Sequence, residues 1–174
     1  IDLIKEESHR DMSNEVADLV ACATNLTFAI ELYLKALLML LDSEFQKVHD
    51  LRGLYDKLPQ QVREIIESVY DTKWPEQAHQ LRGRVSFTLA QGPLEKPKWD
   101  DTKESLALPD LLARSKNSFL SWRYVFELHQ PHDTYRFDRF EYGLLWCAAE
   151  AIKVEIKVRS GKAGRDTSTK PDHL

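Results

Sequence analysis

Apolar residues recur at helical spacing along most of the chain, and the longest such run lies near its beginning. Over residues 13–41 apolar side chains return every three or four positions, which predicts one long helix with Ser13 or Asp11 as its N-cap. Beyond about Ile30 this helix is apolar on nearly every side, so other elements must cover it all round. We therefore expect residues 28–41 to be the central helix of the core.

Two shorter helices are predicted next along the chain. Residues 51–58 carry an apolar stripe, Asp50 precedes them as an N-cap, and Pro59 disfavours continuation of the helix. A third helix follows Pro59 and ends before Trp74 and Pro75, because proline disfavours helical backbone in the residue before it.

The second half of the chain predicts a long loop and two more helices. Between residues 82 and 105 the periodicity weakens, which predicts a long loop or insertion with a brief extended piece at 85–89. Pro109 suits the first turn of a helix that reaches about Leu128. A last helix is predicted over residues 137–158.

Together these elements predict an all-α fold, a helical bundle of four to five main helices. A length of 174 residues suits one domain over 1–160, and the polar residues 161–174 predict a mobile tail. With 43% hydrophobic and 30% charged residues, the composition is that of a globular protein. The formal charge of −4 provides no global positive field, so any polyanion must be held locally.

The composition also favours a soluble protein of the reducing cytoplasm. Cys22 and Cys147 both lie in apolar helical patterns, where buried thiols are expected rather than disulfides. Residues 1–10 carry charged side chains where a signal peptide would be apolar. The most apolar stretch, 28–41, is shorter than the roughly 20 residues that a bilayer requires, so we expect no membrane association.

Glu31 and Lys35 stand four positions apart inside this otherwise apolar helix, where an unpaired charge is costly. One interpretation is a polar pocket shared with Arg123. The other is an internal ion-pair network, for example from Glu31 to Arg123, that fixes how two helices pack. We favour the structural interpretation because buried charges are usually paired for packing reasons.

Further polar residues suggest candidate sites of lower specificity. His49 and Asp50 form a metal-ligand pair, an acid–base pair or, as we favour, a helix cap, because no further His or Cys stands at ligand spacing. Arg82 and Arg84 either contact phosphate from the expected loop or are solvated surface residues. We expect no metal and no cofactor, because the sequence lacks a Gly-rich phosphate loop, a nucleophile elbow and Cys–His metal spacing.

Three segments, in this order, resemble the HEPN family of small helical bundles. They are FAIELYLKALL at 28–38, HDL at 49–51 with the short helix after it, and WRYVFE at 122–127. The resemblance implies an all-α bundle that dimerises through its helices. Family members of this kind include RNA-cleaving toxins of toxin–antitoxin systems, antiviral defence proteins and non-catalytic binding modules.

The resemblance also implies a catalytic pair. Active members carry an Arg followed after four to six residues by a His, and Arg123 with His129 matches this spacing. The guanidinium would hold the scissile phosphate and the imidazole would orient or deprotonate the ribose 2′-hydroxyl, without a metal. Tyr124 departs from the Asn, Asp or His that is usual beside the Arg. A structural alternative pairs Arg123 with Glu127 and leaves His129 exposed at the end of its helix.

Two functions are therefore open at this point. The first is an RNA-directed protein of a stress or defence system, a homodimeric and metal-independent ribonuclease. The second is a non-catalytic helical module that dimerises and binds a protein or nucleotide partner. The match of Arg123 and His129 to the family motif supports the first function, whereas Tyr124, the loose spacing of the two residues and the acidic charge favour the second.

Overall fold

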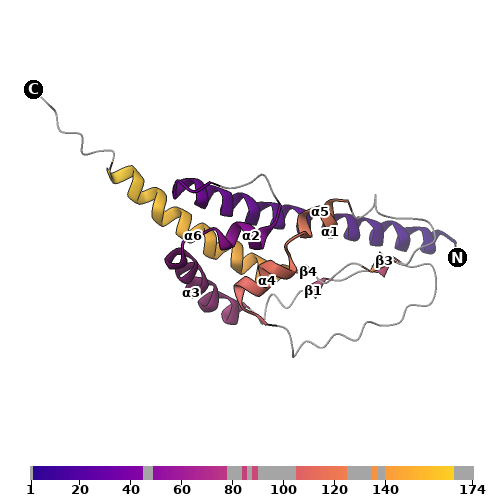
Figure 1. Ribbon diagram of the computed structural model, residues 1–174. Coiled ribbons are helices and arrows are strands. Elements are labelled where there is room, and N and C mark those ends of the chain that lie inside the picture. Colours follow the sequence, from indigo (N-terminus) through magenta and orange to yellow (C-terminus); the bar gives the residue numbers. More distant parts are fainter. Residues whose placement is uncertain are drawn as a thin grey trace, which may run out of the picture.

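The computed structural model describes residues 2–44, 49–77, 84–85, 88–89, 105–124, 135–136 and 140–166. Within these residues the chain forms six helices and two antiparallel pairs of two-residue strands (Figure 1). The all-α fold expected from the sequence is confirmed, although the number of helices exceeds the four to five expected.

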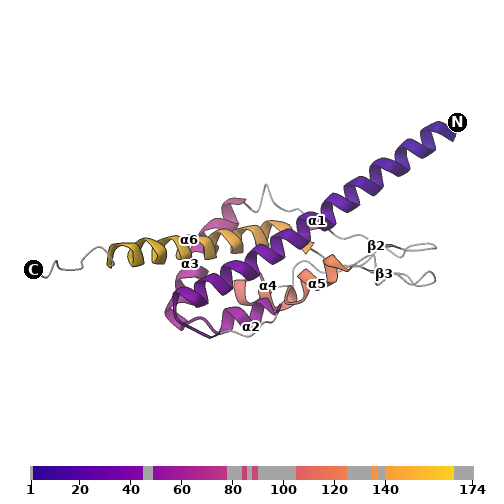
Figure 2. The same ribbon diagram turned by 90° about the horizontal axis from the view of Figure 1, so that it is seen from above.

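Helix α1 spans Asp2–Leu40 and is the longest element that the structure describes. It begins well before Ser13 or Asp11, so the prediction that one of these residues caps it is wrong. Its end follows the Schellman pattern: Asp42 has a φ of 50°, and the N–H of Ser43 donates to the carbonyl of Leu38 at 2.9 Å. Figure 2 shows the N-terminal part of α1 extending beyond the other helices.

Helices α2 (Leu51–Asp56) and α3 (Gln60–Gln77) lie on either side of Pro59, as the sequence predicts. The side chain of Asp50 accepts a hydrogen bond from the N–H of Gly53 and caps α2. Helix α3, however, runs through Trp74 and Pro75, so its predicted end before these residues is wrong. Pro75 lies in the last turn, so the one hydrogen bond lost with its missing N–H disturbs only the end of the helix.

Helices α4 (Leu108–Arg114) and α5 (Ser118–Arg123) replace the single helix predicted from Pro109 to Leu128. Pro109 lies in the first turn of α4, as expected. The break lies at residues 115–117, where serine and asparagine compete with the helix for backbone hydrogen bonds. After this turn, Phe119 and Trp122 both point inward and are buried. Residues 125–128 lie outside the described part of the chain.

Helix α6 spans Tyr142–Asp166, which shifts the predicted last helix toward the C-terminus. Phe140 and Glu141 form strand β4, which pairs with β1 (Arg84–Val85), so the predicted start at residue 137 is wrong. Strand β2 (Thr88–Leu89) pairs with β3 (Tyr135–Arg136), so part of the extended piece expected at 85–89 is present. Residues 161–166 are helical rather than part of a tail, and the rest of the expected tail lies outside the described residues.

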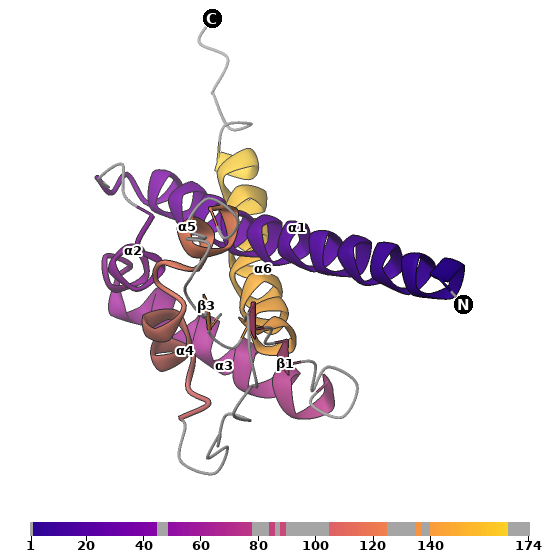
Figure 3. The same ribbon diagram turned by 90° about the vertical axis from the view of Figure 1, so that its right-hand side faces the viewer.

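One hydrophobic core joins these elements. Helix α1 packs against α5 and α6, α3 packs against α6, and α2 packs against α1 and α4. Figure 3 shows α6 crossing α1 in the centre of the molecule. Ile30, Leu34 and Leu37 of α1 are fully buried, and every helix contributes buried side chains to the same cluster. The prediction that residues 28–41 belong to the central helix of the core is therefore correct for one side of the helix. The expectation that other elements cover it all round is wrong, because Leu32 and Met39 are exposed.

Opposite the core, α1 carries an uncharged face that no other described element covers fully. Because helical residues follow one another at about 100°, positions 22, 25, 29, 32, 36 and 39 lie on one side. The exposed or half-exposed residues here, called the outward face of α1 below, are Cys22, Asn25, Ala29, Leu32, Ala36 and Met39. Leu32 is 48% exposed and Met39 67%, so the large apolar side chains of this face reach solvent.

The stretch Ala17–Leu40 of α1 is long and apolar enough to cross a membrane, judged by length and composition alone. The core helix of a soluble protein passes the same test. Here the side that carries Ile30, Leu34 and Leu37 is fully buried against α5 and α6. This burial is what a core helix requires.

Candidate functional site

Glu31 is a buried carboxylate inside the apolar part of α1, with 1% of its side chain exposed. Its Oε1 accepts a hydrogen bond from Lys35 Nζ at 2.5 Å, as the i,i+4 spacing predicts. Its Oε2 lies 2.9 Å from Nδ1 of His49, at the start of α2. The structure thus pairs Glu31 with Lys35 and His49, and the ion pair suggested between Glu31 and Arg123 is wrong.

The turn before α2 holds His49 in this place. Asp50 Oδ1 accepts a hydrogen bond from the N–H of Gly53 at 3.0 Å, which fixes the first turn of α2 directly after His49. A Cβ atom at Gly53 would lie 3.1 Å from Asp50 Oδ2, so glycine gives the capping carboxylate the room that it needs. Asp50 is thus a helix cap, whereas His49 reaches across to α1.

Phe119 of α5 contacts both His49 and Arg123. Its ring stacks on Phe28 with a centroid distance of 5.1 Å and lies 5.2 Å from the ring of His49. The guanidinium carbon of Arg123 lies 5.7 Å from the centroid of Phe119 and 5.3 Å from that of Tyr124. Both contacts are cation–π interactions, so the exposed Arg123 side chain rests on two rings at the end of α5.

These contacts bring Lys35, His49 and Arg123 to one surface, where α1, the start of α2 and α5 meet. Lys35 and His49 both pair with the buried carboxylate of Glu31, while the guanidinium of Arg123 stacks on the rings of Phe119 and Tyr124. An ionised carboxylate can only accept hydrogen bonds, so Nδ1 of His49 carries the proton that faces Glu31. In the neutral imidazole, Nε2 is then an acceptor, and 42% of the His49 side chain is exposed. The arrangement can bind an anion and exchange a proton.

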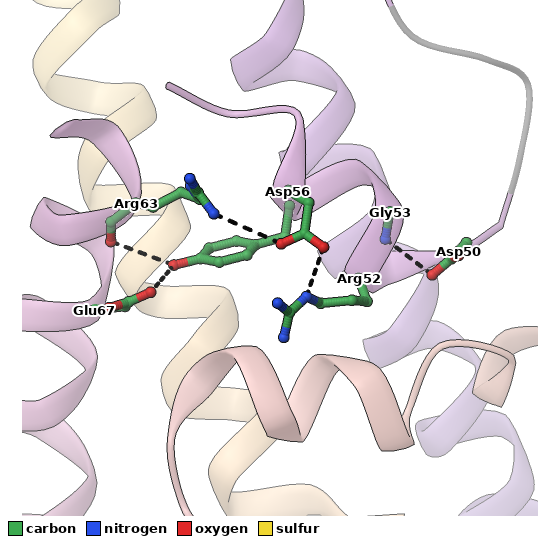
Figure 4. A network of polar contacts seen from close by, with 7 residues as sticks. Asp50, Arg52, Gly53, Asp56, Arg63 and Glu67 are labelled. Carbon is green, nitrogen blue, oxygen red and sulfur yellow. Dashed lines mark hydrogen bonds and ion pairs between the residues drawn. The ribbon is translucent and has the colours of Figure 1, made fainter. Parts of the chain in front are cut away.

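A second polar network fixes α2 against α3 (Figure 4). The hydroxyl of Tyr55 donates a hydrogen bond to Glu67 Oε1 at 2.6 Å, and Arg52 Nε donates to Asp56 Oδ2 at 2.7 Å. Arg63 of α3 approaches the same aspartate, with 3.7 Å between Nη1 and Oδ1. Burial raises the pKa of Tyr55, and its hydrogen bond to Glu67 raises this pKa further. The network holds α2, and with it the turn that presents His49.

The structure describes only some of the other candidate residues suggested by the sequence. Glu127, His129 and Arg82 lie outside the described residues, so the distance between Arg123 and His129 stays a prediction. Arg84 lies in β1, in register with Glu141 of β4. Within the described ranges, no group of three or more His, Cys, Asp and Glu residues is arranged to hold a metal ion.

Sequence reasoning missed the bond between Glu31 and His49 and the central position of Phe119. The two partners of the bond are 18 positions apart, so no helical spacing relates them. One signal was available: a buried glutamate benefits from more than one donor, and His49 precedes the cap of the next helix. Phe119 carried no signal beyond its place on an apolar helical face.

The fold and site together define an all-α bundle in which Lys35 and His49 pair with a buried glutamate and Arg123 stacks on Phe119. A scan against protein families matches the HEPN domain over residues 6–83, a stretch that holds most of α1 and all of α2 and α3. The chain carries a HEPN domain, and the resemblance stated from the sequence is confirmed. The searches of curated proteins and of solved structures each gave no match. The HEPN family includes ribonucleases and nucleotide-binding modules.

Proposed function

We propose that this HEPN protein acts on RNA in a stress or defence system and cleaves it without a metal, with Arg123 and His129 as the catalytic pair. The observation that carries this proposal is the position of Arg123. Its exposed guanidinium rests on Phe119 and Tyr124 at the end of α5, and the ring of Phe119 also contacts His49. On a chain with a formal charge of −4, such a local positive charge is what a phosphodiester requires.

The chemistry of Arg123 fits a scissile phosphate. A guanidinium offers planar, paired N–H donors that match two phosphate oxygens, and stacking on aromatic rings leaves its edge open for that contact. Phe119 itself packs against Phe28 and His49, which fixes the ring on which the guanidinium rests. His129, which is separated from Arg123 by five residues, then supplies the imidazole that orients or deprotonates the 2′-hydroxyl.

The proposed active form is a homodimer that pairs through the outward face of α1. From Cys22 to Met39 this face has the three-and-four spacing of a helix–helix seam and no charged residue. Ala29 and Ala36 allow a second helix to approach closely, and Asn25 can fix the register, as a single polar seam residue does. Phe28 borders this face and also stacks on Phe119, so the seam adjoins the Arg123 site.

The test is cleavage of a labelled single-stranded RNA by the full chain in the presence of EDTA. Arg123→Ala should lower the rate by about 10²- to 10³-fold and His129→Ala by about 10²- to 10⁴-fold, with the circular dichroism spectrum unchanged. Lys157→Ala is the matched charge control, because this exposed lysine lies on α6, away from the site, and should cleave normally. Unchanged cleavage in both site variants would refute the proposal.

A second candidate function is a non-catalytic module that binds a nucleotide or a protein. The observation that favours it is Tyr124, whose ring lies 5.3 Å from the guanidinium carbon of Arg123, where active members have a small polar residue. Two rings around one guanidinium form a stacking surface that binds without any reaction. Binding of the RNA by the wild-type chain without cleavage would select this function.

A further inference from the structure

A second imidazole lies beside Arg123 and has no part in the pair formed by Arg123 and His129. His49 and Arg123 both contact the ring of Phe119, at 5.2 Å between ring centroids and at 5.7 Å from the guanidinium carbon. The two groups cannot be farther apart than these two distances added together. The ring of Phe119 therefore places His49 and Arg123 in the same part of the molecular surface.

We infer that Glu31 and His49 form an acid–base couple that acts on the 2′-hydroxyl of RNA bound at Arg123. This inference rests on the proposed ribonuclease function and assigns a further catalytic residue, His49, and a positioning residue, Glu31. It makes one subunit able to supply both the phosphate-binding cation and the base.

The geometry of the couple is that of an oriented base. Glu31 Oε2 accepts the Nδ1 proton of His49 at 2.9 Å, which fixes the tautomer and leaves the Nε2 lone pair free. Lys35 Nζ occupies the other carboxylate oxygen at 2.5 Å, so Glu31 has no freedom to turn away. Glu31 is 1% exposed and His49 42%, so the anchor is buried and the imidazole reaches solvent.

Stability alone accounts for only part of this arrangement. Glu155 of α6 is also a buried glutamate, with 5% of its side chain exposed, and it pairs with Arg159 four residues on. Glu31 already has the equivalent partner in Lys35, yet it binds His49 as well. The additional partner is the one side chain type that exchanges protons near neutral pH, and it stands beside Arg123.

The proposed step balances within one strand of RNA. Nε2 of His49 takes the proton of the 2′-hydroxyl, so that His129 has the orienting role, and the 2′-oxygen attacks the adjacent phosphorus held by Arg123. The bond from phosphorus to the 5′-oxygen breaks, and the imidazolium of His49 returns the proton through water to that oxygen, which leaves His49 neutral again. The products are a 2′,3′-cyclic phosphate and a 5′-hydroxyl, with no oxidant, reductant or further reactant.

The experiment measures kcat, KM and RNA affinity of full-length variants on a 5′-labelled single-stranded RNA in EDTA. His49→Gln keeps a donor toward Glu31 but cannot act as a base, and should lower kcat about 100-fold or more while KM changes little. Added imidazole should restore cleavage to His49→Ala but not to Arg123→Ala. Glu31→Gln should lower kcat less, and the matched control Glu155→Gln should cleave at the wild-type rate.

The outcomes separate the inference from the proposed function. One outcome would overturn the inference and leave the proposed function standing. In it the wild type cleaves RNA, Arg123→Ala does not, His49→Gln cleaves normally, and imidazole does not change cleavage by His49→Ala. A wild-type chain that binds RNA but does not cleave it would overturn both. If His49→Ala and Glu155→Gln lose cleavage equally and imidazole restores neither, the couple is structural and the inference is again overturned.

Discussion

Tyr55 shows how a single buried hydroxyl couples stability to pH. Burial and the hydrogen bond to Glu67 raise the pKa of this phenol above the value of about 10 that it has in an unfolded chain. Above pH 10 the unfolded chain therefore loses a proton that the folded chain keeps, so the free energy of unfolding falls as the pH rises. Below pH 10 both states keep the proton and this contribution is constant.

Replacement of Tyr55 by phenylalanine should have two effects. At pH 7 the free energy of unfolding should fall by about 1 kcal/mol, because Glu67 loses its donor. Above pH 10 the variant should lose stability less steeply than the wild type. Urea denaturation between pH 7 and pH 11 measures both effects, and Tyr70→Phe provides a second case, since burial also raises the pKa of Tyr70. If the free energy of unfolding of both variants falls above pH 10 as steeply as that of the wild type, this account is contradicted.

At this scale, the sequence predicts local partners but not distant ones. The pairing of Glu31 with Lys35 follows from their spacing along one helix. The bond from Glu31 to His49 depends on how α1 and α2 pack, and no repeat in the sequence contains that information. For the same reason the sequence suggested an ion pair between Arg123 and Glu31, whereas the structure places the guanidinium on aromatic rings.

At the scale of elements, the short helix α2 depends on its cap. Asp50→Ala should lower the free energy of unfolding by about 1 kcal/mol, because the N–H of Gly53 loses its acceptor. Asp50→Asn keeps an acceptor oxygen and should cost much less. The measurement is urea denaturation, with hydrogen exchange of the α2 amides to locate the change. Equal losses in the two variants would show that charge, rather than the capping bond, matters at this position.

The existence of the helices was easier to predict than their ends. The apolar spacing correctly placed α2 after Asp50 and α3 after Pro59. It missed the turn at residues 115–117, because Phe119 and Trp122 continue the apolar face across it. It also assigned Phe140 to a helix, since a single buried aromatic fits either a helix or the strand pairing with β1 that the structure shows.

At the scale of the whole molecule, the proposed dimer makes a clear prediction for the outward face of α1. Leu32→Glu should convert a dimer into a monomer in light scattering after size-exclusion chromatography, because a charge would be buried in the seam. Ile65→Glu is the matched control: Ile65 of α3 is 46% exposed, close to the 48% of Leu32, but lies off this face.

If the outward face of α1 has no partner, or a partner other than a second copy of the chain, the same measurements give different results. A wild-type chain that is monomeric at every concentration would refute the dimer. If the wild-type chain sediments with phosphatidylcholine vesicles and Leu32→Glu loses that binding, the outward face would be assigned to a membrane instead.

The sequence predicted the family and the all-α bundle at this scale. It could not predict this face, because an apolar helix looks the same in sequence whichever neighbour covers it.

The packing of α6 across α1 and α3 has a consequence for synthesis of the chain. The HEPN match ends at residue 83, yet α6, which begins at Tyr142, covers the helices inside that match. During translation, the apolar side of α1 therefore leaves the ribosome about 100 residues before its cover does. In that interval Ile30, Leu34 and Leu37 lack the cover that α6 gives them in the folded protein. We therefore expect the yield of folded protein to depend on protection of the first helix until the last one is made.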